Sequence, residues 1–384
     1  MSVYIQGRGV CSPVGLTLRQ NLASLSESFT NFTELDSLPI GRILDEIPGL
    51  ESRLCKELPR SAQLGLLVSA EALKSSQDRL SLLNRHECAV VAGSSRGAAD
   101  LLELSYSSWK SGERISPKTS PLTTSGILSS SVSREHGLHG PGFTISSACS
   151  TGLHTVGIAS MMIRLGHCGQ AMVLSSESCI TSFTLNMLKQ ARVYGKGICD
   201  EFPCRPWSDQ SNGMILSEGA GAIYLTNERG AYPICAIAGY GAATERVSLT
   251  GVSDGGTALV EAMGKACKDA GVLPADIDVV VGHGSGTLRG DFGEIAACNS
   301  FFEGCVPPVC VHKWMTGHML GASSLYSLIV ATELFDFPKL PRHPYAYHRD
   351  LISSDSIDLD QCNNILCLSL GFGGNAAAII LTRC

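Results

Sequence analysis

Short runs of apolar and β-branched residues recur along the chain, and segments with helical periodicity separate them. The runs "CAVVAGSS" (88–95), "QAMVLSSES" (170–178) and "DVVVGHGSGT" (278–287) stop at small or polar residues. Such runs are typical of strands buried on both faces, and their alternation with helices is typical of parallel sheets that carry helices on both faces. The sequence therefore predicts an α/β fold.

The order of these elements occurs twice. The strand "VYIQGRGVC" (3–11) and the strand "GAGAIYLTN" (219–227) bracket the first set, and "YPICAIAGYGAAT" (232–244) begins the second. We therefore predict an N-terminal half over residues 1–228 and a C-terminal half over residues 229–384. No strong repeat of individual residues accompanies the pattern, so the duplication is inferred from the order of elements alone.

Composition narrows the class of protein. With 384 residues, 44% of them hydrophobic and 17% charged, the chain can bury a large core. A net charge of −6 gives no general attraction for nucleic acid, and no run of about 18 apolar residues predicts a membrane span. The first residues lack the pattern of a signal peptide, so we expect a cytoplasmic protein.

Sixteen cysteines are present, which in such a chain indicates reduced thiols rather than a disulfide framework. Three pairs share a C-x4-C spacing, namely Cys199 with Cys204, Cys305 with Cys310, and Cys362 with Cys367. This spacing differs from the C-x2-C of zinc knuckles. We expect no metal and no cofactor.

One cysteine stands where a strand turns into a helix. In "FTISSACSTGLHTVGIASMM" (143–162) an apolar run halts at small residues, meets Cys149, and continues at helical spacing. The first N–H groups of a helix lack partners and the helix dipole favours a thiolate there, so Cys149 is a candidate nucleophile. A buried cysteine that packs as a small hydrophobe is the alternative. His154, just over one turn later, is expected to pack.

Three glycine-marked turns at strand ends hold further catalytic residue types. In "GHGSGTLRGDFGEI", His283 precedes Asp291 and Glu294; in "HKWMTGHMLGAS", Lys313 precedes His318 by five residues; in "SLGFGGNAA", Phe372 lies between glycines. Each turn by itself is also compatible with an ordinary structural loop. Their joint presence with Cys149 favours one catalytic site.

Five motifs in order resemble one family. "GPGFTISSACSTG", "RPWSDQSNGMILSEGAGAIYL", "GHGSGTLRGDFGEI", "HKWMTGHMLGAS" and "LGFGGNAAAIIL" are similar in order and spacing to the β-ketoacyl-acyl carrier protein synthases, the elongating condensing enzymes of the thiolase-like superfamily. The similarity spans essentially the whole chain. It implies a five-layer αβαβα fold of two duplicated halves, and a dimer formed through the sheet edges near the nucleophile helix.

The resemblance also implies roles for individual residues. Cys149 would carry the acyl group as a thioester, and His283 and His318 would stabilise the enolate that forms when a malonyl thioester loses CO2. The backbone N–H groups of Cys149 and Phe372 would form the oxyanion hole. Lys313 would hold the imidazoles neutral, and Glu294 would pair with Lys313. Asp291 is expected to hold its own loop.

The resemblance implies an acyl carrier protein as partner, with malonyl and acyl thioesters as substrates. Thr124 and Ser125 match the region that lines the acyl tunnel from the partner subunit, and Phe372 would gate that pocket. Lys196 and Arg205 are candidate contacts for the carrier protein. The partner subunit would be a second copy or another ketosynthase-like chain.

Departures from the family pattern point to a specialised polyketide or polyene branch. "GFGGNAAA" stands where GFGGTN is usual, and "RPWSDQSNGM" lacks a charge pair. Thiolase activity and a non-condensing role as a chain-length factor are the alternatives. A thiolase would need a second reactive cysteine in a C-x-G turn, which "LCLSLGFGG" does not supply, and a non-condensing chain-length factor would typically lack the nucleophile.

Overall fold

Buried apolar strands form the centre of the molecule in a computed structural model. The structure describes residues 2–49, 53–76, 84–196, 201–246, 249, 251–340, 343–348, 357–359 and 361–384. Every residue of the strands β4 (Cys88–Gly93), β6 (Gln170–Glu177) and β7 (Gly219–Thr226) is buried. These are the runs without polar alternation, so the prediction of strands covered on both faces is confirmed.

Ten strands form one continuous sheet. The order from edge to edge is β10-β9-β13-β14-β8-β1-β7-β6-β4-β5. The other strands of this sheet are β1 (Val3–Cys11), β5 (Gly142–Ile145), β8 (Cys235–Thr244), β9 (Val279–Val281), β10 (Val309–Cys310), β13 (Asn364–Gly371) and β14 (Asn375–Thr382). The two halves meet where β1 pairs with β8.

Both halves of the sheet have the same topology. Counted outward from the centre, β1, β7, β6, β4 and β5 match β8, β14, β13, β9 and β10, and the order of these strands along the chain is the same in each set. Each set has antiparallel pairs near the centre and parallel pairs at the edge. The fold is thus duplicated in connectivity.

The prediction of parallel sheets is wrong for the middle of the molecule. Only the outer three strands of each half run parallel, whereas β13 and β14 form an antiparallel hairpin through residues 372–374. A parallel connection needs a crossover of about a dozen residues, and three residues allow only a hairpin. The sheet is therefore mixed.

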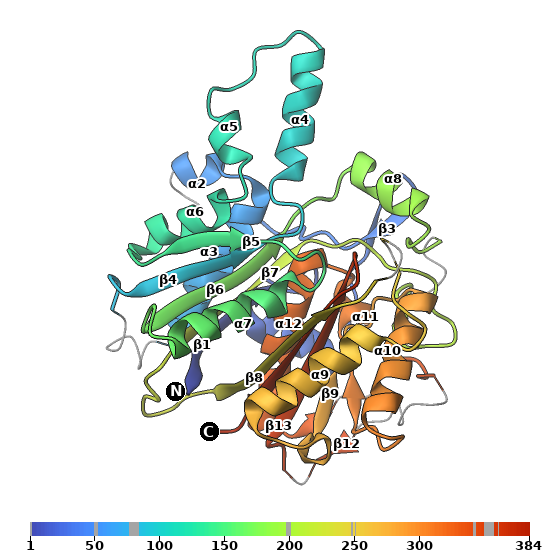
Figure 1. The fold of residues 1–384 in the computed structure, drawn as a ribbon. Helices are drawn as coiled ribbons and strands as arrows, with labels where there is room; N and C mark the ends of the chain where they lie inside the picture. The colour runs from blue at the N-terminus through green and yellow to red at the C-terminus, as the bar shows by residue number, and fades with distance from the viewer. Residues whose placement is uncertain are drawn as a thin grey trace.

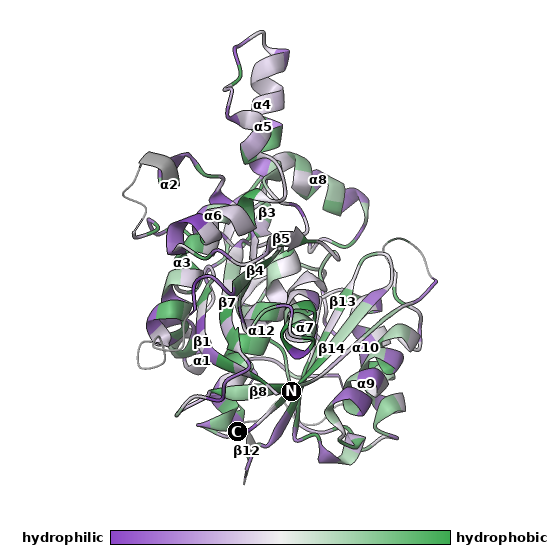
Figure 2. Cartoon of the chain, turned by 60° about the vertical axis from the view of Figure 1, so that its left-hand side comes forward, coloured by the Kyte–Doolittle hydropathy of each residue, from purple (hydrophilic) through white to green (hydrophobic). Residues whose placement is uncertain are grey.

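Helices complete five layers (Figure 1). α7 (Thr151–Arg164) and α12 (Ser323–Ala331) lie between the two half-sheets and contact strands of both. α3 (Arg60–Ser75) and α6 (Ile127–His136) cover the first half-sheet, and α9 (Thr257–Ala270), with α10 (Leu288–Phe301) against it, covers the second. Figure 2 shows central α12 as hydrophobic, whereas outer α9 mixes both kinds of residue.

Smaller elements surround these layers. The helices are α1 (Leu18–Ser26), α2 (Arg53–Glu57), α4 (Ala99–Lys110), α5 (Thr119–Leu122), α8 (Ser182–Gln190) and α11 (Lys313–Thr316), with 3-10 turns at Pro274–Asp276, Leu320–Ala322 and Thr332–Phe335. Two small sheets pair β2 (Thr33–Leu35) with β3 (Leu38–Ile40) and β11 (Lys339–Leu340) with β12 (Ile357–Asp358). α4 and α5 project from the body (Figure 1). None of the described helices is long and apolar enough to cross a membrane.

Glycine pairs reveal a repeat that the sequence pattern did not. A Cβ added at Gly7 or Gly9 of β1 would overlap a carbonyl of α3, and one added at Gly239 or Gly241 of β8 would overlap a carbonyl of α9. In each half the first strand thus lets its covering helix pack directly on the strand backbone. "GRG" and "GYG" are short, which is why they carry little signal in the sequence alone.

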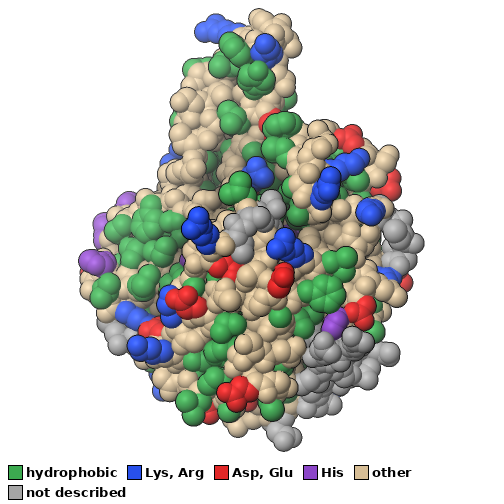
Figure 3. All heavy atoms as spheres, turned by 45° about the vertical axis from the view of Figure 1, so that its right-hand side comes forward, with side chains coloured by type: hydrophobic (Ala, Val, Ile, Leu, Met, Phe, Trp, Pro, Cys, Tyr) green, Lys and Arg blue, Asp and Glu red, His purple; other side chains and the backbone are tan. Residues whose placement is uncertain are grey.

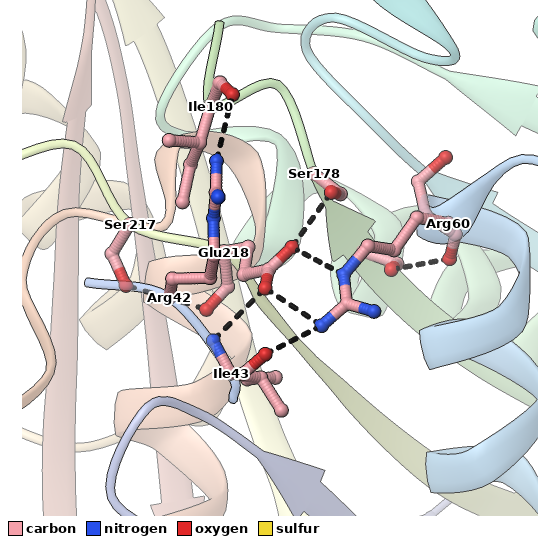
Figure 4. Close-up of polar contacts among 9 residues, drawn as sticks. Arg42, Ile43, Arg60, Ser178, Ile180, Ser217 and Glu218 are labelled. Carbon is pink, nitrogen blue, oxygen red and sulfur yellow. Dashed lines mark hydrogen bonds and ion pairs between the residues drawn. The ribbon is translucent and has the colours of Figure 1, made fainter. Parts of the chain in front are cut away.

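Arg60 forms an ion pair with a buried carboxylate in the first half (Figure 4). The Arg60 guanidinium donates from Nε to Glu218 Oε2 at 2.8 Å and from Nη2 to Glu218 Oε1 at 2.9 Å. Glu218 also accepts from Ser178 Oγ at 2.7 Å and from the backbone N–H of Ile43 at 2.9 Å. Because Glu218 is only 1% exposed, its charge depends on these donors.

Replacing Arg60 by Met should therefore lower the free energy of unfolding by roughly 3 kcal/mol, because it leaves a buried carboxylate without its cation. Urea denaturation measures the effect. Lys118→Met, which breaks the more exposed pair between Lys118 and Glu57, is the control and should cost about 1 kcal/mol or less. Equal losses in the two variants would contradict this account.

Candidate active site

Cys149 lies in the turn between β5 and α7. The turn is closed by hydrogen bonds around Thr151, whose Oγ1 accepts from Ser147 N at 2.8 Å and donates to Ala148 O at 2.6 Å. Ala148 has a φ of +50°, a left-handed conformation that is uncommon for a residue with a side chain. Cys149 follows at once, two residues before α7 begins, and is 8% exposed. The expected strand-to-helix turn is confirmed.

The end of β13 closes over this turn. A Cβ added at Gly371 would lie 2.9 Å from Ser147 O, so the close approach requires glycine. The next residue, Phe372, directs its backbone N–H to the Cys149 side chain. Asn375 Nδ2 donates to Phe372 O at 3.1 Å, which fixes the loop. The altered "GFGGNAAA" sequence thus places an amide where it holds Phe372.

The two histidines come from different turns and meet edge to face. His283 follows β9 and His318 lies between α11 and α12, with ring centroids 5.3 Å apart and an interplanar angle of 75°. Ser369 on β13 links His283 to the nucleophile turn, because its Oγ donates to Cys149 O at 3.2 Å and lies 3.5 Å from His283 Nδ1. The sequence alone does not predict this role for Ser369, because its only signal is a serine inside an apolar strand.

Lys313 and Glu294 contact different groups of His283: Lys313 contacts the carbonyl oxygen and the ring, and Glu294 contacts the backbone N–H. The Lys313 ammonium donates to His283 O and lies 3.5 Å from His283 Nδ1. The Glu294 carboxylate accepts from the backbone N–H of His283, from Gly284 N at 2.8 Å and from Trp207 Nε1 at 2.6 Å. Both residues are described, and no ion pair within 4.0 Å joins them. The expected direct pairing is therefore corrected: two backbone N–H groups and one indole N–H group donate to the carboxylate, and the ammonium contacts the histidine instead.

Asp291 holds its loop, as expected. It accepts from Trp207 N and Ser211 Oγ at 3.0 Å each, and from Ser285 Oγ and Gly286 N at 3.1 Å each.

His318 is fixed through its backbone, whose N–H donates to Ile215 O at 2.6 Å. Both histidines therefore sit on loops that hydrogen bonds hold rigidly, as a preorganised site requires.

Burial and one cation set the protonation states. Burial, followed by the charge of Lys313, places the pKa values of His283 and His318 well below the usual imidazole range, so both rings are neutral at neutral pH. Burial raises the pKa of Cys149 to about 11, and Lys313 opposes that rise. Burial also lowers the pKa of Lys313 from its usual value, while Glu294 raises it.

One cavity of about 690 Å³ joins these groups. Cys149, His283, His318 and Phe372 line it together with apolar side chains such as Leu188 and Met214. The convergence that the sequence motifs predicted is thus present in three dimensions. A cavity of this size, lined by both apolar and polar side chains, suits an organic substrate.

Most of the other residues that the sequence analysis named lie outside the described lining of this cavity. Thr124 and Ser125 are exposed between α5 and α6 and are not part of the described lining of this cavity. Lys196 lines the cavity, whereas Arg205 is absent from its described lining and binds Phe202 O at 3.1 Å. His154 packs on α7 and its Nδ1 lies 2.6 Å from Tyr240 Oη.

The cysteines are free thiols wherever the structure describes them, as expected. Cys199, one member of a C-x4-C pair, lies outside the described residues. No cluster of three or more His, Cys, Asp or Glu side chains suited to a metal ion was found within the described ranges.

A thiol and two neutral imidazoles around one cavity of a duplicated α/β fold are typical of enzymes that transfer acyl groups through a covalent thioester. Two family models match the chain: Beta-ketoacyl synthase, N-terminal domain, over residues 8–231, and Beta-ketoacyl synthase, C-terminal domain, over residues 234–342. The chain therefore belongs to the beta-ketoacyl synthase family.

Individual relatives agree over the full length. The 3-oxoacyl-[acyl-carrier-protein] synthase 2 of Vibrio cholerae is 27% identical, with 99% of both chains covered. A chain of the ishigamide ketosynthase/chain length factor structure matches with a TM-score of 0.90 and 21% identity, covering 100% of this chain and 99% of its own. A chain of a type II polyketide synthase acyl-carrier protein complex with its ketosynthase matches with a TM-score of 0.88 and 20% identity, with 100% and 99% covered.

Replacing Lys313 by Met should shift the alkylation of Cys149 to higher pH by roughly one unit or more, because the ammonium lowers the pKa of the thiol. The rate of iodoacetamide labelling of Cys149 as a function of pH, followed by peptide mass spectrometry, measures the shift. Lys189→Met on the exposed end of α8 is the control and should leave the profile unchanged. An unchanged profile in Lys313→Met would show that the ammonium does not act on the thiol.

Proposed function

We propose that this chain catalyses decarboxylative Claisen condensation, with Cys149 as the nucleophile. Membership of the beta-ketoacyl synthase family and relatives named 3-oxoacyl-[acyl-carrier-protein] synthase 2 make it a condensing enzyme of the acyltransferase type. The observation that carries the assignment of residues is the single cavity that Cys149, His283 and His318 share.

In the first step the Cys149 sulfur attacks the carbonyl carbon of an acyl thioester. The C–S bond of the incoming thioester breaks, and the released thiol takes up a proton. The N–H of Phe372, which reaches the Cys149 side chain, and the N–H of Cys149 stabilise the oxyanion. The Lys313 charge and the N-terminus of α7 favour the thiolate against its burial.

In the second step a malonyl thioester loses CO2 and its enolate attacks the acyl group on Cys149. A C–C bond forms, the bond to the Cys149 sulfur breaks, and the thiol regains a proton. The His283 Nδ1 lies 3.5 Å from Lys313 Nζ, and an ammonium can only donate, so the proton of the neutral ring belongs on Nε2. That N–H and the His318 ring then stabilise the enolate oxygen.

The substrates are proposed to be acyl and malonyl thioesters of an acyl carrier protein. One matched structure is described as an acyl-carrier protein in complex with its ketosynthase, and another as a ketosynthase/chain length factor. Exposed Arg192, Lys196 and Arg289 line the described cavity and suit an acidic carrier. The partner subunit is proposed to be a second copy or a ketosynthase-like chain. The presence of Cys149 argues against a non-condensing role.

Two further assignments belong to this proposal. We divide the chain into halves at residues 228 and 229, which the repeated strand order supports. We also place the protein in the cytoplasm, a location that the many free thiols favour.

Cys149→Ala should abolish 3-oxoacyl product in an assay with acyl- and malonyl-carrier protein, because it removes the nucleophile. Cys149→Gln should lose condensation and keep CO2 release, since the imidazoles remain. His283→Ala should lose both, with CO2 release falling roughly a hundredfold or more because a donor to the enolate is gone. Product formation by Cys149→Ala equal to wild type would refute the nucleophile, and unchanged CO2 release in His283→Ala would remove that histidine from the enolate site.

Thr124 and Ser125 are proposed to line the acyl pocket of the partner subunit. Both are exposed in their own chain and available to a second subunit. Thr124→Phe should then shorten the acyl products, because a larger side chain shortens the pocket. Mass spectrometry of the acyl groups on Cys149 measures product length, and an unchanged range would place Thr124 outside the pocket.

A further inference from the structure

Arg96 places a positive charge in the catalytic cavity. It lines the cavity with Cys149, and its side chain is exposed. Within the part of the chain that the structure describes, no hydrogen bond or ion pair engages its guanidinium. The charge is therefore available to a molecule that enters the cavity.

The loop that carries Arg96 is held in place. It follows β4, whose last residue Gly93 pairs with Ile145 of β5, four residues before Cys149. The buried Glu177 carboxylate accepts from the backbone N–H of Ser95, from Ser94 Oγ at 3.1 Å and from Gly321 N at 3.2 Å. One carboxylate thus fixes the Arg96 loop against the loop that leads from His318 to α12.

The cavity is electropositive. Its described lining contains four cations, Arg96, Arg192, Lys196 and Arg289, and no Asp or Glu. Figure 3 shows Lys and Arg side chains around the base of the projecting α4 and α5. Burial raises the pKa of Cys149, and the charge of Arg96, like that of Lys313, opposes this rise, so Arg96 acts electrostatically on the thiol.

A plain hydrocarbon chain fits this environment poorly. It would displace water from the guanidinium without offering an acceptor, and burying part of a charge without a partner costs free energy. A carboxylate would instead accept the paired N–H groups of arginine in a bidentate contact. The chemistry of the cavity therefore favours an acyl group with a second, anionic end.

We propose that Arg96 determines acyl specificity by binding the free carboxylate of a dicarboxylic acyl group while its thioester carbonyl lies at Cys149. This inference rests on the proposed function and deepens it, because it names the class of acyl group that the condensing site accepts.

Self-acylation tests the proposal without a carrier protein. The full chain is incubated with N-acetylcysteamine thioesters of succinate, glutarate and adipate, and in parallel with those of butanoate, pentanoate and hexanoate, which match them in carbon number. The Cys149 sulfur forms the new thioester and N-acetylcysteamine leaves as the free thiol with a proton. Intact mass and peptide mapping follow the rate of labelling at Cys149. These thioesters carry no phosphate, so any preference reports on the acyl group.

We expect at least one dicarboxylic member to label Cys149 about tenfold faster than its monocarboxylic match, and Arg96→Met to abolish that ratio. Arg96→Lys should keep part of the ratio, and Lys189→Met, at an exposed position of α8 outside the described lining of the cavity, should keep all of it. The ratio within one variant does not depend on how much of that variant is folded. Equal rates for both series in the wild type, or the same ratio in Arg96→Met as in the wild type, would overturn the inference about Arg96. In that case, labelling of Cys149 by the monocarboxylic series would still support Cys149 as the nucleophile. No labelling by either series would overturn both.

Discussion

The close contact between α7 and α12 is the constraint on which the site depends. A Cβ added at Gly152 near the start of α7 would lie 2.6 Å from Leu325 N and 2.6 Å from Ser324 Oγ at the start of α12. Both helices begin at the same place in the central layer, so the turn before α7 and the loop before α12 are neighbours. The first carries Cys149 and the second carries His318. A bulkier residue at position 152 would push apart two groups that line one cavity.

Burial is the main cause of the shifted pKa values in the site, and the charge of Lys313 is the next largest cause. Burial of Cys149, His283 and His318 penalises the charged form of each, which keeps both imidazoles neutral and raises the pKa of the thiol. The lysine ammonium reinforces the first effect and opposes the second. It remains close to His283 because the backbone and indole N–H groups around Glu294 satisfy that carboxylate. A direct ion pair between the two would have weakened the effect of this cation on the pKa values of the histidine and the cysteine.

Strong local patterns were predictable and spatial relations between distant segments were less so. The strands β4, β6 and β7 are uniformly apolar runs, and the turn at Cys149 has small residues between a strand and a helix. Sheet direction in the middle of the molecule was predicted wrongly, since apolar runs look alike whether their neighbours run parallel or antiparallel. The roles of Ser369 and Glu177 are not predictable from the sequence, because a single serine or glutamate inside a strand gives no periodic signal. Each nevertheless links turns that are far apart in the sequence.

The sequence by itself determined which residues form buried strands, where the chain turns at glycine, and which side chains capable of catalysis stand at strand ends. These properties follow from hydrophobicity and backbone preference, which act over a few neighbouring residues. Only the tertiary structure decided that Lys313 donates a hydrogen bond to His283 and forms no ion pair with Glu294. It also decided that Ser369 contacts both Cys149 and His283, and that Arg96 lines the same cavity. Those relations depend on how two half-sheets close around α7 and α12, and packing between distant segments leaves no pattern along the chain.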